Sequence, residues 1–398
     1  MTGSPSAEVR SPNRRLVVVV VPDFTPTIGG TVRQATLQAQ GMLHRGYRVV
    51  VLTRRYDRGW PSHAQSDGLD IVRFGLPGRG GLAEKLSLVI LAAWFARRRH
   101  QIVLVQSIMY SDYALAASAV GLRSAVAVVW AAHGEATDVL GEAPDRLRSL
   151  QRGLRRSVLF GCHHVALTGA IRDELTAQGL CGASIAVIPV PVDVLKFRPP
   201  SPDERAQARA DLGIDPGELV VTFTGRFVRT KGVDRLIEAF ARLRASAPRS
   251  RLLLVGGGSD QENKQVRADA ARWQLADSVI MSGVVVDVER SLWASDIFVL
   301  PSVREGLSNS LVEAMACGLP CVAGAEAGGD QVLYSGAGLI PASSDVSELY
   351  QALVDLSEDE PLRRQLGRAA VQRTQSFTPD RVAARYEDLV LTHLGEEP

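Results

Sequence analysis

Cysteine and lysine are scarce in this chain, and each scarcity excludes something. Four cysteines in 398 residues do not make a disulfide framework, which favours small, buried thiols in a reducing cytosol. The run Cys162-His163-His164 lacks a second ligand pair at zinc-finger spacing, so no metal site is expected there. Only four of the 45 basic residues are lysines, a bias that reports genome composition more than function.

Long hydrophobic runs are absent as well. The run Leu16–Val21 is too short for the core of a signal peptide, and Leu86–Ala96 is too short to span a bilayer. These lengths predict a soluble, cytoplasmic protein. The most that it could make with a membrane is peripheral contact at the inner face.

The net charge of +2 conceals an uneven distribution. Residues 1–190 carry 22 basic and 13 acidic side chains, a net +9, whereas residues 191–398 carry 23 and 30, a net −7. A basic front half suits an acidic acceptor or an anionic membrane surface, although scattered, solvated arginines would produce the same count. Nucleic acid is not expected as a partner, because no aromatic stacking platform accompanies the basic residues.

Short β-branched runs alternate with longer segments of helical periodicity, as in parallel α/β domains. In the first half we expect strands over Leu16–Val21, Arg48–Leu52, Asp70–Arg73, Ile102–Gln106, Ala125–Val129, His164–Leu167 and Ala186–Ile188, and helices over Val32–Arg45 and Leu82–Arg98. In the second half we expect strands over Leu219–Thr224, Arg251–Val255, Val279–Met281, Ile297–Pro301 and Cys321–Ala323, and helices over Val233–Ala245, Gln261–Trp273, Asn309–Ala316 and Pro379–Leu394.

A proline-rich segment, Pro189–Pro202, separates the two alternations and is expected to be an interdomain linker. The sequence therefore predicts an α/β fold of two doubly wound, Rossmann-like domains, over residues 1–190 and 191–378. Ligands bind at the carboxyl ends of the strands in such sheets, so two facing domains would form a cleft suited to two substrates.

The most informative segment is Asp296–Val322, D-I-F-V-L-P-S-V-R-E-G-L-S-N-S-L-V-E-A-M-A-C-G-L-P-C-V. It predicts a strand, a loop with Glu305, and a helix with Glu313. The two carboxylates could serve a hydrolase, but continuous helix would place them about 12 Å apart, against the roughly 5 Å of a retaining hydrolase. Contacts to hydroxyls of a sugar and a ribose, at two ends of one ligand, fit better. The helix start, near Leu307 to Ser310, offers free backbone N–H groups to a diphosphate that lies between the two glutamates.

A second segment, G-R-F-V-R-T-K-G over residues 225–232, follows another expected strand. Gly225 permits a turn, and Arg226 and Lys231 form a basic pair. Such a pair could bind a diphosphate and stabilise the charge that develops as it leaves. Basic loop residues are usually solvated, so this segment gains its weight from its combination with the two glutamates.

Two loops of the first half also follow strands. In P-T-I-G-G, Gly29 and Gly30 let the backbone approach a ligand at the start of a helix, which is a common arrangement by itself. In A-H-G-E, His133 follows the strand Ala125–Val129, where a structural and a functional role are about equally expected.

Together these blocks resemble family 4 of the retaining, nucleotide-sugar-dependent glycosyltransferases with the GT-B fold. The resemblance covers nearly the whole chain and includes H-R-G-Y at residues 44–47 and G-G-G-S at residues 256–259. It is most specific in E-G-L-S-N-S-L-V-E-A-M-A-C-G-L-P, residues 305–320. It implies a hexosyltransferase that moves a sugar from a nucleotide diphosphate, UDP by default, to an acceptor without a metal or other cofactor.

The resemblance also implies roles for individual residues. His133 would contact the donor sugar, Arg226 and Lys231 the diphosphate, and Glu305 the sugar hydroxyls. The donor-binding set would further include Gly29, Gly30, Gly306, Leu307, Ser308, Asn309 and, on the ribose, Glu313. Glu305 could otherwise be read as a nucleophile, since the family has no settled protein nucleophile. The final helix, Pro379–Leu394, would cross back onto the first domain.

Two segments depart from the family pattern. Pro189-Val190-Pro191-Val192-Asp193 replaces the usual P-N-G-V-D of the linker. Gly328-Gly329-Asp330-Gln331 stands where relatives often carry a glutamate after two glycines, which bears on the choice of donor.

The acceptor stays open. Arginines at residues 97–99, and five more over Arg146–Arg156, suit a cell-envelope polysaccharide or glycolipid acceptor at a membrane, with a small specialised metabolite as the alternative. A GT-B epimerase or phosphorylase and a non-catalytic sugar-nucleotide sensor are the other classes. The sensor is disfavoured because Arg226, Lys231, Glu305 and Glu313 are all present.

Overall fold

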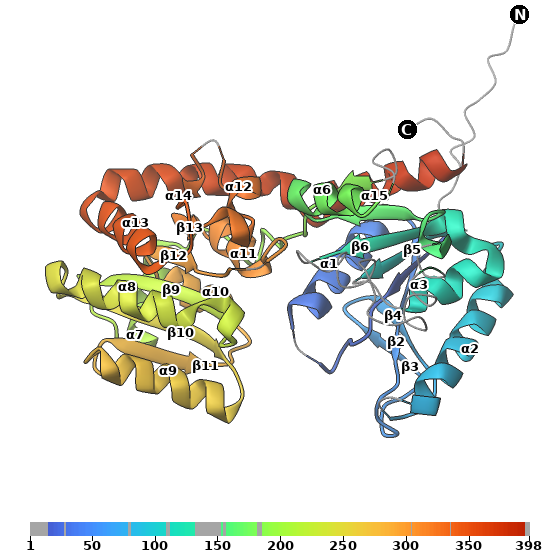
Figure 1. Ribbon diagram of the computed structural model, residues 1–398, viewed down its shortest axis with the longest axis horizontal. Helices are drawn as coiled ribbons and strands as arrows, with labels where there is room; N and C mark the ends of the chain where they lie inside the picture. Colours follow the sequence, from blue (N-terminus) through green and yellow to red (C-terminus); the bar gives the residue numbers. More distant parts are fainter. Residues whose placement is uncertain are drawn as a thin grey trace, which may run out of the picture. The chain divides into compact units, whose positions relative to one another are not determined.

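The computed structural model describes residues 15–394, apart from residues 28, 79–80, 109–111, 132–152, 154–156, 181–184, 304 and 335. The chain forms two compact units (Figure 1). Unit 1 is Met1–Pro191 together with Pro379–Pro398, and unit 2 is Val192–Thr378. The sequence placed the boundary between residues 190 and 191, one residue before this division.

Unit 1 is built on a sheet with eight described strands in the order β3-β4-β2-β1-β5-β6-β7-β8. The strands are β1 (Leu16–Val20), β2 (Arg48–Arg54), β3 (His63–Ser66), β4 (Leu69–Phe74), β5 (Ile102–Ile108), β6 (Val126–Trp130), β7 (His163–Ala166) and β8 (Ile185–Val187). Its helices include α1 (Gly30–His44), α2 (Gly81–Arg98), α3 (Asp112–Ala117), α6 (Gly169–Ala177) and α15 (Pro379–Leu394). Within the described strands, β3 alone runs antiparallel to its neighbour, β4.

The central strand explains why this sheet is doubly wound. All five residues of β1, Leu-Val-Val-Val-Val, are buried, as expected for a parallel strand covered on both faces. The chain moves outward from β1 to β2, and it returns past β1 when it passes from β4 to β5. Because such crossovers are right-handed, α1 and α2 cover opposite faces of the sheet.

The C-terminal helix α15 packs on α1 in unit 1 (Figure 1). The two backbones come so close that a Cβ at Gly41 would lie 2.5 Å from the carbonyl oxygen of Pro379. Glu387 of α15 pairs with Arg45 and accepts a 2.9 Å hydrogen bond from the Tyr47 hydroxyl. Contacts across more than 300 residues of sequence therefore complete the first unit.

Unit 2 has six described strands in the order β11-β10-β9-β12-β13-β14. They are β9 (Leu219–Arg226), β10 (Ser250–Gly257), β11 (Val279–Gly283), β12 (Ile297–Leu300), β13 (Cys321–Ala323) and β14 (Gly338–Leu339). The helices are α7 (Pro202–Asp211), α8 (Val233–Ser246), α9 (Asp260–Arg272), α10 (Val288–Trp293), α11 (Asn309–Ala316), α12 (Gly329–Val332), α13 (Val346–Glu358) and α14 (Glu360–Thr374). Two parallel-dominated, doubly wound sheets confirm the predicted α/β class.

Asp296, directly before β12, fastens α7 to the sheet of unit 2. Its carboxylate accepts 2.6 Å hydrogen bonds from Arg205 and Arg209 and a 2.8 Å bond from the backbone N–H of Val220. The Arg209 side chain is buried, with 7% of its surface exposed. Removing the carboxylate would therefore leave a buried guanidinium without its counter-charge.

We expect Asp296→Ala to lower the free energy of unfolding by about 3 kcal/mol. The substitution leaves the buried guanidinium of Arg209 without a counter-charge and the backbone N–H of Val220 without its acceptor. Asp277→Ala, at an exposed position in the same unit, is the matched control and should change it by less than about 0.5 kcal/mol. Urea unfolding followed by circular dichroism measures both. Equal midpoints for the two variants would contradict the anchoring role of Asp296.

Candidate functional site

The predicted basic residues and Glu305 converge at one point of the unit 2 sheet. β9 ends at Arg226, and β12 ends at Leu300, just before the loop that carries Glu305. The two strands are neighbours, and the winding direction of the chain reverses between them. Ligands of open α/β sheets bind at the carboxyl ends of strands at such a reversal.

Lys231 and Glu305 form an ion pair at this point. Lys231 ends a 3₁₀ turn, η5 (Arg229–Lys231), and its ammonium group donates to the Glu305 carboxylate. Both side chains are largely buried, with 18% and 17% of their surface exposed. Burial, reinforced by the charge of Arg226, lowers the pKa of Lys231 to about 8. The site therefore holds a cation that gives up its proton easily and the carboxylate that balances it.

The Glu305 loop is held from several sides by residues that the sequence did not single out. Arg235 donates a 2.5 Å hydrogen bond to the carbonyl of Pro301, and Ser344 donates a 3.1 Å bond to the carbonyl of Ser302. The Glu305 N–H donates to the carbonyl of Glu326 at 3.0 Å. These contacts reach the loop from distant parts of the chain, so no local spacing could have indicated them.

Two glycines let backbones meet at the site without side chains between them. Gly256 lies opposite Gly225 in the pairing of β10 with β9, at a φ of +126°, and a Cβ there would lie 2.0 Å from the Gly225 carbonyl oxygen. Gly328, at a φ of +77°, would place a Cβ 2.4 Å from the carbonyl oxygen of Gly306. The departing Gly328-Gly329-Asp330-Gln331 segment thus supports the Glu305 loop, with Asp330 itself exposed.

The amino end of α11 follows this loop. Gly306, Leu307 and Ser308 are buried, and Asn309 begins the helix. Ser308 is the N-cap residue but makes no side-chain cap; its hydroxyl is 2.9 Å from that of Ser310. Glu313 lies one turn into the helix and is buried. Since the helix starts at Asn309, the two glutamates sit on different elements and not on one continuous helix.

In unit 1 the glycine loop precedes α1, at the carboxyl end of β1. Gly29 is the N-cap residue of α1, where a glycine supplies no side-chain cap, and Gly30 is the first residue of the helix. A Cβ at Gly29 would meet no atom of the described residues within 4 Å, so packing against them does not require glycine there. His133 lies outside the described residues.

His164, the second histidine of the Cys-His-His run, has a structural role. Trp130 donates its indole N–H to Nδ1 of His164 at 3.0 Å, so Nε2 carries the proton and donates to the carbonyl of Leu159 at 3.1 Å. Burial lowers the pKa of His164 to about 4. Among the residues that the structure describes, no group of three histidine, cysteine or acidic side chains is placed to hold a metal ion.

Binding of a nucleoside diphosphate is expected to weaken as the pH rises above about 8. The pKa of Lys231 lies below the usual value for lysine, so the free protein loses this charge as the pH rises through about 8. The affinity should then fall by up to about tenfold per pH unit. Lys231→Arg keeps its charge over this pH range and should give a flatter profile. Calorimetric titrations of UDP and GDP measure the two profiles; parallel profiles would exclude Lys231 as the titrating group.

Gly256→Ala is expected to lower the thermal unfolding midpoint, since its Cβ collides with the Gly225 carbonyl and its backbone is strained, at a cost of about 1–3 kcal/mol or more. Gly257→Ala is the matched control, because the nearest side chain to its Cβ is 3.5 Å away. A Gly256→Ala protein as stable as the control would show that the strand ends are not so closely constrained.

Two family models match the chain in succession. "Glycosyltransferase Family 4" covers residues 28–195, and "Glycosyl transferases group 1" covers residues 204–373. A "GDP-mannose-dependent monoacylated alpha-(1-6)-phosphatidylinositol monomannoside mannosyltransferase" of Corynebacterium glutamicum is 32% identical over 48% of this chain and 52% of its own length. A "D-inositol 3-phosphate glycosyltransferase" of Pseudarthrobacter chlorophenolicus is 32% identical over 64% of this chain and 62% of its own. The match thus spans between about half and two thirds of these relatives' lengths.

Solved structures share the fold. Sucrose-phosphate synthase of Thermosynechococcus elongatus superimposes with a TM-score of 0.75 at 22% identity, over 96% of this chain and 100% of that one. The Anabaena protein HepE, solved with UDP and glucose, gives 0.74 at 18% identity, over 95% and 100%. These likenesses confirm the predicted GT-B fold.

Proposed function

The chain belongs to glycosyltransferase family 4, and we propose that it transfers a hexose from a nucleoside diphosphate sugar to an anionic or glycolipid acceptor. The observation that carries this proposal is the meeting of Arg226, Lys231 and Glu305 at the switch point of unit 2. Two cations and one carboxylate match a donor with an anionic diphosphate beside a hydroxyl-rich sugar.

The Lys231–Glu305 pair is exchanged when the donor binds. The diphosphate takes the ammonium group of Lys231, with Arg226 on the same phosphates and the amino end of α11 beside them. Glu305, released from Lys231, accepts hydrogen bonds from sugar hydroxyls. Glu313 accepts from the ribose. His133, Gly29 and Gly30 keep the roles that the family resemblance implies.

The transfer retains configuration at the sugar, by displacement on one face without a protein nucleophile. Glu305 is a poor nucleophile in the donor complex because the sugar hydroxyls donate hydrogen bonds to its carboxylate and stabilise its negative charge. The leaving diphosphate needs positive charge, and Arg226, Lys231 and the α11 dipole supply it in place of a metal ion. Release of free nucleotide sugar without an acceptor, or dependence on inorganic phosphate, would favour the epimerase or phosphorylase class instead.

The acceptor carries phosphate, inositol or lipid. The names of the two relatives described above contain phosphatidylinositol monomannoside and inositol 3-phosphate, and the net +9 charge of residues 1–190 suits an anionic partner. We place the reaction in cell-envelope glycolipid or polysaccharide synthesis in the cytoplasm, with unit 1 in peripheral contact with the membrane. No described helix is long and apolar enough to cross a bilayer. A small specialised metabolite remains the alternative acceptor.

The donor screen tests this function directly. The protein is heated with UDP, GDP, ADP, dTDP and their sugar conjugates in the presence of EDTA, and the unfolding midpoint is recorded. We expect one nucleotide and its sugars to stabilise the protein, with UDP as the default and GDP-mannose as the alternative that the mannosyltransferase relative suggests. Stabilisation by none of them would contradict the proposal.

Two variants then separate the assigned roles. Glu313→Ala should weaken donor binding by about tenfold or more, because a buried charge-assisted hydrogen bond is lost. Lys231→Ala should weaken donor binding and, at saturating donor, also lower turnover by roughly a hundredfold, because charge on the leaving diphosphate is no longer balanced. Unchanged affinity and turnover in both variants would overturn the roles of these residues.

A further inference from the structure

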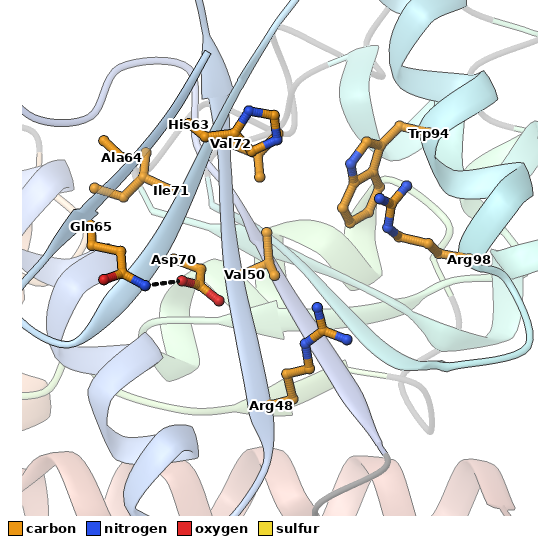
Figure 2. Close-up of a pocket in the computed structure, with 10 residues that line it drawn as sticks. All are labelled: Arg48, Val50, His63, Ala64, Gln65, Asp70, Ile71, Val72, Trp94 and Arg98. Carbon is orange, nitrogen blue, oxygen red and sulfur yellow. Dashed lines mark hydrogen bonds between the residues drawn. The ribbon is translucent and has the colours of Figure 1, made fainter. Parts of the chain in front are cut away.

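A groove in unit 1 lies apart from the carboxyl ends of its strands. It runs between α2 and one face of the outer strands β2, β4 and β3, and it has a volume of about 550 Å³ (Figure 2). That volume is typical of small-molecule sites. Arg48 is the first residue of β2 and Arg98 the last of α2, so the groove opens toward the amino ends of the parallel strands. The glycine loop before α1 follows the opposite end of β1.

The register of the sheet shows why polar groups line this groove. Val50 pairs with Asp70, and Gln65 pairs with Asp70 from the other side, so their side chains share one face. Val72 and His63 are paired on that same face, and Arg48 joins it two residues before Val50. This is the face that α2 covers. On this face Val50 is buried, whereas the polar residues Arg48, His63 and Gln65 are exposed.

The groove is a cationic site. Its ten lining residues include two arginines, Arg48 and Arg98, and one acid, Asp70, which already accepts a 2.9 Å hydrogen bond from Gln65 (Figure 2). Across the described part of the chain, neither Arg48 nor Arg98 has an ion-pair partner. Arg98 is instead stacked on Trp94, 4.4 Å from the ring centroid. Stacking orders the guanidinium and leaves its N–H edges available for a planar or tetrahedral anion.

The exposed side of α2 carries a cluster of apolar residues, with Glu84 and Lys85 exposed among them. Leu82, Leu86, Val89 and Ile90 are exposed, with 72% and 66% exposure at Leu82 and Val89. Leu91 and Phe95 are fully buried on the inner side, so the helix is apolar on both sides. The arginines at 97–99 stand at its end. Exposed apolar residues next to a cluster of cations are complementary to an anionic lipid surface. The apolar residues would contact the acyl chains, and the arginines would contact the phosphates.

We propose that this groove binds the phosphorylated headgroup of an anionic phospholipid while the outer side of α2 rests in the membrane interface. Arg48 and Arg98 hold the phosphate, and Trp94 lies at the boundary between headgroup and acyl chains, where indole rings are enriched. The inference rests on the membrane contact proposed above and not on the transfer reaction, because the donor residues belong to unit 2.

The test compares two neighbouring arginines. Arg98→Gln removes a groove residue; Arg97→Gln removes the same charge one position earlier, outside the groove lining. Each full-length variant is sedimented with phosphatidylcholine vesicles with and without phosphatidylglycerol. Loss of one surface charge should weaken partitioning to anionic vesicles about fivefold. Loss of a headgroup contact should weaken partitioning to anionic vesicles by tens of times. Arg98→Gln and Arg48→Gln should therefore each lose more vesicle binding than Arg97→Gln.

Further arms distinguish the other outcomes. Arg98→Lys keeps the charge without the guanidinium fork and should recover only part of the binding. Equal losses for Arg97→Gln and Arg98→Gln would overturn the groove site and leave the membrane contact standing, whereas absence of vesicle binding by the unaltered protein would overturn both.

Calorimetry with glycerol 3-phosphate distinguishes a lipid headgroup from a free phosphate ester as the ligand of the groove. Binding of this soluble ester through Arg48 and Arg98 without vesicle binding would assign the groove to a free phosphate ester and contradict the lipid. Nucleotide stabilisation should be unchanged in every variant, which separates these results from the proposed transfer.

Discussion

The proposed donor site depends on one ion pair, between Lys231 and Glu305. It lies where β9 and β12 diverge, the point at which a doubly wound sheet leaves room for a ligand. Two charges buried there would be costly if either stood alone, so each secures the other until a ligand replaces it. The same burial lowers the pKa of Lys231, and the charge of Arg226 lowers it further. When the pair opens, the ammonium group becomes available to a diphosphate and the carboxylate to sugar hydroxyls, which suits a nucleoside diphosphate sugar.

The surrounding structure makes this pair possible through close backbone contacts. Gly225 and Gly256 bring the ends of β9 and β10 together, and Gly328 lets a later segment pack on Gly306. Arg235 and Ser344 fix the carbonyl groups of Pro301 and Ser302, the two residues that follow the end of β12. The loop of Glu305 is thus held by the backbone, and its carboxylate is positioned before any ligand arrives. Such preorganisation favours donor binding, because the carboxylate that accepts from the sugar hydroxyls does not have to be ordered when the donor arrives.

Most strands of the two sheets could be predicted from the sequence, because buried parallel strands such as Leu-Val-Val-Val-Val are runs of β-branched residues. The edge strand His63–Ser66 contains no such run, because His-Ala-Gln-Ser has little β propensity. The sequence signal for this hairpin was the Asp67-Gly68 pair, which forms the turn with both residues at positive φ. Glu305 and Lys231 were each expected to bind the donor, but their pairing joins positions 74 residues apart and follows only from the fold. The contacts of Asp296 with Arg205 and Arg209 were missed for the same reason.

The most direct test of the ion-pair exchange is a crystal structure of the protein with the nucleoside diphosphate that stabilises it. The account predicts that Lys231 leaves Glu305 and that its ammonium group contacts the diphosphate beside Arg226, with Glu305 turned toward the position of the sugar. A bound nucleotide whose phosphates lie elsewhere, with the Lys231–Glu305 pair intact, would contradict it.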